Sequence, residues 1–294
     1  MREYLLLHLV ILAWGFTAIL GKLIELPPVD VVLWRTLLAA LGFAGLERLM
    51  GRSLKVPRAE AHKMLGVGAI LGLHWMLFFG SARLATASVS LAALPTAMLW
   101  CTLIEPWVDG TRRWRPLELV VGVVIVGAVW MIYEVELRYW LGFTVGILSA
   151  LLAALFSVIN KQLVARWHYG IMGFYQMAGA FAISVVGWLI MLPQAGSLVV
   201  PSWLDVVWLV LLASVCTVGA YAGYMHVLRR LSVFTVNVIY NLEPVYGIIL
   251  AVLIFGSREH MSPGFYAGAG IIVGSVLLVP TLRKWVEGNR GMGM

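Results

Sequence analysis

Charged residues are scarce in this chain. Asp, Glu, Lys and Arg make up 12% of its 294 residues, against about a quarter in a typical soluble domain. Hydrophobic residues make up 62%, and the mean hydropathy is +0.93. A soluble protein of this composition would expose large apolar patches and aggregate. The composition therefore excludes an ordinary soluble domain and predicts an all-α polytopic membrane protein.

Cysteine and the common catalytic motifs are nearly absent. Cys101 and Cys216 lie far apart within apolar runs, a pattern that predicts neither a disulfide framework nor a metal site. The chain contains no P-loop, no H-E-x-x-H pair and no G-x-S-x-G elbow. We expect no metal, no cofactor and no enzymatic activity. The net charge is +7, and the basic residues lie between the apolar segments. This placement indicates that they determine the orientation of the helices in the membrane, and it does not indicate a nucleic-acid partner.

Apolar segments of membrane-spanning length fill almost the whole chain. A spanning helix needs about 20 mostly apolar residues. Prolines at positions such as 57, 193 and 263 fall near the expected ends. The sequence predicts ten transmembrane helices, at 4–24, 29–49, 64–82, 84–108, 116–133, 140–166, 169–192, 203–228, 231–256 and 263–282.

The basic residues predict the orientation of these helices. If the N-terminus is inside, the inner side receives 16 of the 21 lysines and arginines. Because short cytoplasmic loops carry an excess of Lys and Arg, both termini are expected to be cytoplasmic, including a short C-terminal tail. Lys22 and Arg35 fall on the outer side, where we expect them to anchor helix ends at the interface.

The two halves of the chain resemble each other. Segment 83–95 resembles segment 230–244, and the alignment pairs Thr86 with Thr235 and Pro95 with Pro244. Five helices in each half is an odd number, so the halves would enter the membrane from opposite sides. The sequence therefore predicts two inverted five-helix repeats, residues 1–135 and 136–294. Secondary transporters commonly use this plan, with substrate bound near the membrane midplane.

Polar and aromatic side chains inside the apolar segments are candidates for a binding site. Asn237, Tyr240, Asn241 and Pro244 share one face of an expected helix. Polar groups at membrane depth are not expected to face lipid. Hydrogen bonding between helices is the alternative role for them. The candidate substrate-binding residues are Trp14, His74, Trp75, Asn160, Tyr221, Asn237, Tyr240 and Asn241.

Titratable residues and prolines inside the apolar segments are candidates for roles in a transport cycle. Glu243 and His74 are titratable groups within apolar segments and are candidates for proton coupling. Glu243 could instead cap backbone groups or pair with a base, and His74 could simply be satisfied by a neighbour. Pro95 and Pro244 each remove a backbone hydrogen bond and are candidate hinges, with a packing kink as the alternative.

Several short motifs together resemble a known family. They are Trp14-Gly15-Phe16 with Lys22, Arg35, the segments 241–246 and 256–259, and the glycine-rich last helix. On these residues the chain resembles ten-helix, EamA-type members of the drug/metabolite transporter superfamily. The resemblance implies a carrier of the bacterial inner membrane, often an exporter of amino acids or other small metabolites, with a central cavity. The acid that the family pattern expects after the fourth helix is met only loosely, by Asp109.

These observations predict a secondary transporter that works by alternating access on an amino acid-like metabolite. It would act in the lipid bilayer as a monomer or homodimer. A lipid or lipid-linked sugar flippase is the nearest alternative and would need a lateral opening between helices. A membrane-embedded enzyme would need clustered acids, bases or metal ligands. A purely structural subunit would pack its polar stripes together without a cavity.

Overall fold

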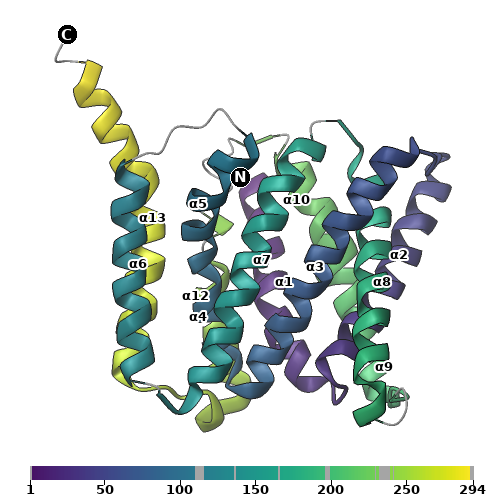
Figure 1. Cartoon of the computed structure of the whole chain (residues 1–294), viewed down its shortest axis with the longest axis horizontal. Coiled ribbons are helices and arrows are strands. Elements are labelled where there is room, and N and C mark those ends of the chain that lie inside the picture. Colours follow the sequence, from purple (N-terminus) through teal and green to yellow (C-terminus); the bar gives the residue numbers. More distant parts are fainter. Residues whose placement is uncertain are drawn as a thin grey trace.

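The computed structural model describes residues 2–109, 116–135, 137–164, 166–195, 199–228, 230–231, 239–240 and 242–291. Over these residues the chain is helical and contains no β-strand. The helices run side by side in a single bundle (Figure 1). The described residues therefore form an all-helical structure, as the sequence predicts.

Most elements overlap the expected apolar segments, although α3 begins at Arg58, before the expected start at 64, and residues 232–238 and 241 of the expected helix 231–256 lie outside the described residues. Three short turns, η1, η2 and η4, are 3-10 helical, whereas η3 is a π-helix. In chain order the elements are α1 Arg2–Leu23, α2 Pro28–Leu49, α3 Arg58–Leu84, α4 Ala87–Ala93, η1 Leu94–Thr96, α5 Ala97–Asp109, α6 Pro116–Val135, η2 Leu137–Tyr139, α7 Trp140–Val164, α8 Tyr169–Ala195, α9 Trp203–Ala213, η3 Ser214–Gly219, α10 Ala220–Leu228, α12 Glu243–Phe255, η4 Gly256–Glu259 and α13 Pro263–Gly291.

Seven helices in the described part of the chain are long and apolar enough to cross a membrane. They comprise α1, α2, α3, the α4–α5 rod, α7, α8 and the α9–α10 rod. Large apolar side chains such as Ile190, Trp203 and Leu253 point out of the bundle, as a lipid-facing surface requires. The chain is therefore a multi-pass helical membrane protein, while the count of ten spans stays a prediction.

The two prolines with expected hinge roles lie in different settings. Pro95 interrupts the expected helix at 84–108, which divides into α4, η1 and α5. A proline inside a helix removes one hydrogen bond and clashes with the preceding turn, so a break at this point is physically expected. Pro244 instead lies in the first turn of α12, where its missing N–H has no intrahelical partner to lose. It does not lie deep inside a helix.

Helices from the two halves of the chain pack against each other. Helix α3 packs on α7 and α8, and α2 packs on α8. Gly68 of α3 and Gly179 of α8 let these two backbones approach closely, because a Cβ at either position would meet the backbone of the other helix. Helices α1 and α7 run in opposite directions, and α1 begins at the end where α13 finishes (Figure 1). The interior surfaces are thus shared between the halves.

Candidate functional site

Arg35 on α2 is the most unusual group in the interior. It is 2% exposed, and its guanidinium carbon lies 3.7 Å from the centroid of the Trp75 ring on α3. Its Nε donates a hydrogen bond of 2.9 Å to Oγ1 of Thr217. The expectation that Arg35 anchors a helix end at the interface is therefore wrong. Arg35 lies on the face of α2 that packs toward α3 and η3.

The π-helix η3 presents Thr217 to this arginine. The Thr217 hydroxyl donates to the carbonyl oxygen of Leu212 at 2.8 Å, five residues earlier in the chain, so its oxygen is left to accept from Arg35. π-Helical turns within α-helices are rare and occur frequently at functional sites. Here the wide turn shapes one wall of the Arg35 environment.

His74 and Ser149 connect α3 to α7. The Nδ1 atom of His74 lies 2.8 Å from Oγ of Ser149 and 2.9 Å from its carbonyl oxygen. The Ser149 hydroxyl donates to the backbone carbonyl of His74 at 2.9 Å. This reciprocal contact fixes the orientation of the imidazole ring. Its Nδ1 atom is the donor, because the Ser149 carbonyl oxygen can only accept. The alternative considered for His74 was a hydrogen bond to a neighbouring residue. Ser149 is that neighbour.

Glu243 stands between the arginine and a group of aromatic rings. It is buried at the start of α12. It interacts electrostatically with Arg35 and accepts a hydrogen bond from the hydroxyl of Tyr240. The ring of Trp14 on α1 packs edge-on against Tyr240, with centroids 5.7 Å apart, and against Tyr224 at 5.2 Å. Trp14 therefore links α1 and α10 to Tyr240, which lies beside Glu243.

A second polar contact lies between α7 and α8. The side-chain amide of Gln176 donates to Oδ1 of Asn160 at 2.7 Å, and both residues are buried. Tyr221 on α10 approaches Asn160 and packs edge-on against Phe43, with centroids 5.7 Å apart. Asn160 and Tyr221, both candidate substrate-binding residues, are thus brought together.

The expected site residues lie in separate groups of contacts. Trp75 lies against Arg35, Trp14 and Tyr240 lie beside Glu243, and His74 is held by Ser149. Asn237 and Asn241 lie outside the described residues. Sequence reasoning gave no site role to Arg35 or Gln176. The available signal for both was a strongly polar side chain within an apolar run, which is costly in a membrane unless it has a partner or a function.

An ion pair joins the end of α1 to η4. Lys22 Nζ lies 3.0 Å from Oε1 of Glu259, which is fully buried in η4. Glu259 also accepts from the backbone amides of Ala87 and Ser88 at the start of α4. Burial raises the pKa of Glu259, but the hydrogen bonds from Ser88, Ala87 and Lys22 outweigh it, so its pKa is lowered from the ordinary value. Lys22 therefore joins the end of α1 to η4, and its anchoring role at the membrane interface stays a prediction.

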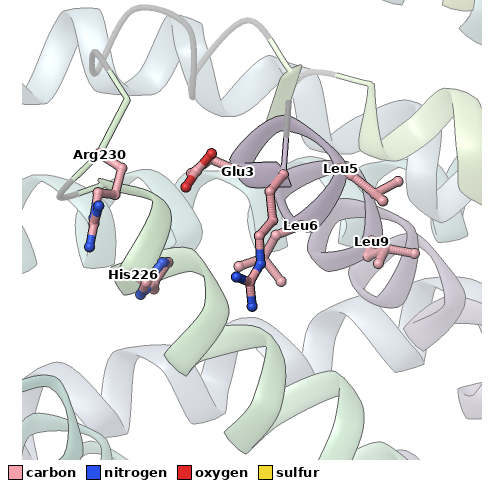
Figure 2. A pocket seen from close by; sticks show the side chains of 7 residues that line it. Glu3, Leu5, Leu6, Leu9, His226 and Arg230 are labelled. Carbon is pink, nitrogen blue, oxygen red and sulfur yellow. The ribbon is translucent and has the colours of Figure 1, made fainter.

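A pocket of about 510 Å³ opens near the beginning of α1 (Figure 2). It is away from the Arg35 neighbourhood and includes none of the expected site residues. Its lining combines an apolar floor from α1 with basic and titratable side chains near the end of α10. The lining residues are Arg2, Glu3, Leu5, Leu6, Leu9, His226 and Arg230.

Comparisons with known proteins agree with this architecture. Residues 140–281 match the model of the EamA-like transporter family. A solved structure, described only as a crystal structure of a protein, superimposes with a TM-score of 0.66 and covers 96% of each chain. Its sequence is 18% identical, so it supports the fold alone. No curated protein matches the sequence. The family match agrees with the resemblance drawn from the sequence: residues 140–281, just under half of the chain, are similar to the EamA-like transporter family.

Proposed function

We propose that this chain is a secondary transporter that exports an amino acid or a similar small metabolite by alternating access. The observation that carries the proposal is the placement of Arg35, His74 and Glu243 inside an apolar helical bundle. Ionisable groups within a membrane are costly and commonly line substrate or ion pathways. The match to the EamA-like transporter family supports the same function.

The aromatic and polar residues around these groups would hold the substrate. Trp14, Trp75, Tyr221 and Tyr240 offer ring faces and edges, and Asn160 offers an amide. Asn237 and Asn241 are proposed to join them from the segment before α12. Glu243 or His74 would couple protons to transport, and the break at Pro95, with Pro244 as its partner in the second half, would serve as a hinge.

The membrane arrangement is part of the same proposal. Two inverted five-helix repeats, residues 1–135 and 136–294, would rock against each other around the central site. Both termini would be cytoplasmic in a bacterial inner membrane, and the protein would act as a monomer or homodimer. The opposite directions of α1 and α7 support the inversion, because these are the first helices of the two halves (Figure 1).

Reconstitution tests the transport function directly. Purified protein in proteoliposomes is expected to release preloaded amino acids faster than empty liposomes do. A panel of the twenty common amino acids and a set of neutral metabolites would identify the substrate. Glu243→Gln is expected to slow that flux at least tenfold, since a buried ionisable group in the pathway is lost. Equal release from protein-containing and empty liposomes for every solute would contradict the proposal.

A lipid flippase is the second candidate, and the pocket at the start of α1 is the observation that favours it. Leu5 and Leu9 in its lining are mostly exposed, and Arg2 and Arg230 add positive charge beside them (Figure 2). Basic pockets between membrane helices can hold anionic lipid headgroups. A flippase would move fluorescent phosphatidylglycerol between leaflets of proteoliposomes, and an Arg2→Gln/Arg230→Gln variant would do so more slowly. A carrier of water-soluble metabolites would leave the lipid distribution unchanged.

A further inference from the structure

The pocket at the start of α1 gathers positive charge that no nearby protein group balances. Arg2 on α1 and Arg230 just after α10 both line it, and both are exposed. Within the described part of the chain, neither forms an ion pair within 4.0 Å, and neither does Glu3, the acid in the same lining. Two guanidinium groups that share one pocket repel each other unless an anion lies between them. The pocket is therefore suited to a negatively charged group.

The apolar side of the pocket continues along α1 as an exposed stripe. Leu5 and Leu9 line the pocket, and Leu12 follows on the same face of the helix. These three side chains are 63%, 53% and 39% exposed. The stripe covers about 10 Å of helix axis, since each residue of a helix rises about 1.5 Å. A soluble anion would leave this stripe uncovered, whereas an acyl chain would lie along it.

The pocket lies at one end of the interface between α1 and α10. The two helices pack together through an apolar cluster that includes Leu7, Val10 and Val227. His226 and Arg230 lie across the pocket from the residues of α1 (Figure 2). The backbone N–H of Arg230 donates to the carbonyl oxygen of Val227 at 2.9 Å, which holds Arg230 at the end of α10. A molecule in the pocket would therefore contact both helices.

The size of the pocket distinguishes a lipid headgroup from a simple ion. Its volume of about 510 Å³ is in the range of small-molecule sites, roughly 300–1,000 Å³, and exceeds what one inorganic anion fills. The phosphodiester of a phospholipid carries one negative charge, and its oxygens can accept paired hydrogen bonds from a guanidinium. Basic pockets between membrane helices bind anionic headgroups in this way.

We propose that this pocket binds an anionic phospholipid of the surrounding leaflet, which stays bound and is not carried across the membrane. Its phosphate lies between Arg2 and Arg230, and one acyl chain follows Leu5, Leu9 and Leu12. The lipid joins α1 to α10, and so joins the first half of the chain to the second. The site is separate from the Arg35 neighbourhood, so this inference goes beyond the proposed function and does not depend on the solute that the protein carries.

Thermal melting of the purified, delipidated full chain in detergent tests the ligand class. Dioleoyl-phosphatidylglycerol is expected to raise the melting temperature. Dioleoyl-phosphatidylcholine has the same acyl chains but no net charge, and it should raise the melting temperature much less. Inorganic phosphate and glycerophosphate supply the anion without acyl chains and should have no effect. Equal stabilisation by the two lipids would overturn the charge requirement, and a full shift with either soluble anion would overturn a lipid as the occupant.

Variants test whether the effect arises at this pocket. Arg2→Gln/Arg230→Gln should weaken binding of phosphatidylglycerol roughly tenfold or more, because each arginine near a membrane surface adds about fivefold to the affinity for anionic lipid. Lys55→Gln/Arg58→Gln is the matched control, since it removes two exposed positive charges outside the pocket, and it should keep wild-type binding. Glu3→Gln removes a carboxylate that repels the phosphate, so it should tighten binding severalfold.

Two outcomes of the variants would contradict the site. An equal loss of binding in both double variants would show a general attraction to surface charge. Weaker binding by Glu3→Gln would show that no anion lies beside this carboxylate. If Arg2→Gln/Arg230→Gln does not fold, Arg2→Lys/Arg230→Lys, which keeps the charge but lacks the planar fork, should bind with intermediate affinity, and binding equal to that of the wild type would overturn the paired contact.

Transfer of labelled lipid separates a bound lipid from a transported one. In proteoliposomes, fluorescent phosphatidylglycerol should stay in its leaflet at the rate seen in empty liposomes. Faster transfer that is lost in Arg2→Gln/Arg230→Gln would show that the lipid is cargo and would overturn the inference. If no solute is carried but phosphatidylglycerol still stabilises the wild type through these arginines, the proposed function fails and this inference stands.

Discussion

Lys22 Nζ lies 3.0 Å from Glu259 Oε1, and Lys161 Nζ lies 2.9 Å from Glu105 Oε1. Both lysines are near the C-terminal ends of helices, α1 and α7, that run in opposite directions, so the two ion pairs lie at opposite ends of the bundle (Figure 1). Each pair joins the first helix of one half to the other half of the chain. This reciprocity supports the proposed inverted repeat.

The two ion pairs are expected to differ in strength. Glu259 is fully buried and accepts two backbone amide bonds besides Lys22, whereas Glu105 is 15% exposed and its partner Lys161 is 64% exposed. Glu259→Gln should therefore destabilise the fold by about 1.5–3 kcal/mol, the range for hydrogen bonds to charged groups. Glu105→Gln, the matched control, should cost less than about 1 kcal/mol because exposed pairs contribute little. Thermal melting in detergent would compare them, and equal losses would contradict the difference in burial.

Acid should weaken the contact at Glu259. Its pKa is below the ordinary value of 4.5 in the folded protein, so the ionised form is favoured by folding. The resulting stability is fully present above the ordinary pKa and is lost as the pH falls through the lower, folded-state pKa. The difference in melting temperature between wild type and Glu259→Gln should therefore be largest near neutral pH and shrink in acid. A difference that stays constant from neutral pH to about pH 3 would show that the carboxylate charge is unimportant.

The crossing of α3 and α8 depends on two glycines with no room for a side chain. A Cβ on Gly68 would collide with the backbone carbonyl of Gln176, and a Cβ on Gly179 would collide with that of Leu65. Backbone atoms cannot move aside as a flexible side chain does, so Gly68→Ala should destabilise the fold by about 1–3 kcal/mol. Gly66→Ala, two residues away, meets nothing within 4 Å.

Gly68→Ala and Gly66→Ala are expected to change the stability of the fold in opposite directions. Gly66→Ala should be neutral or slightly stabilising, because alanine favours a helix over glycine by up to about 1 kcal/mol. Melting temperatures of the two variants would be compared in the same detergent. If Gly68→Ala melts at or above the wild-type temperature, the two helices do not pack as closely as described.

The helices were predictable from the sequence because lipid leaves little choice of structure. Backbone groups in hydrocarbon must be bonded within the segment, so a long apolar run such as 203–228 becomes helical. The break at Pro95 followed from the missing N–H. The beginning of α12 at Glu243 was not predicted, because the apolar run extends well before it and Pro244 was interpreted as a kink inside a longer helix; a proline in the first turn is instead a helix-start signal.

The site was predictable only in part. Trp14 and Tyr240 were both chosen as candidate binding residues, but nothing in the sequence indicates that they contact each other, since they are far apart in the chain. Arg35 was assigned to the interface because it lies early in its helix. Its true environment depends on Trp75 from α3 and on the π-helical turn that presents Thr217. Helical periodicity gives the face of a residue on its own helix but not the partner opposite that face.

The His74–Ser149 contact should be a measurable tie between α3 and α7. Ser149→Ala removes the hydroxyl that accepts from Nδ1 and donates to the His74 carbonyl, and the loss should be about 1 kcal/mol. Ser184→Ala is the control: Ser184 is also buried, but its hydroxyl bonds to Ala180 in its own helix. Such intrahelical bonds add little, so that variant should melt close to the wild type. Equal behaviour of the two variants would mean that the hydroxyl of Ser149 does not hold the histidine and that the bond from Nδ1 to the Ser149 carbonyl oxygen is sufficient.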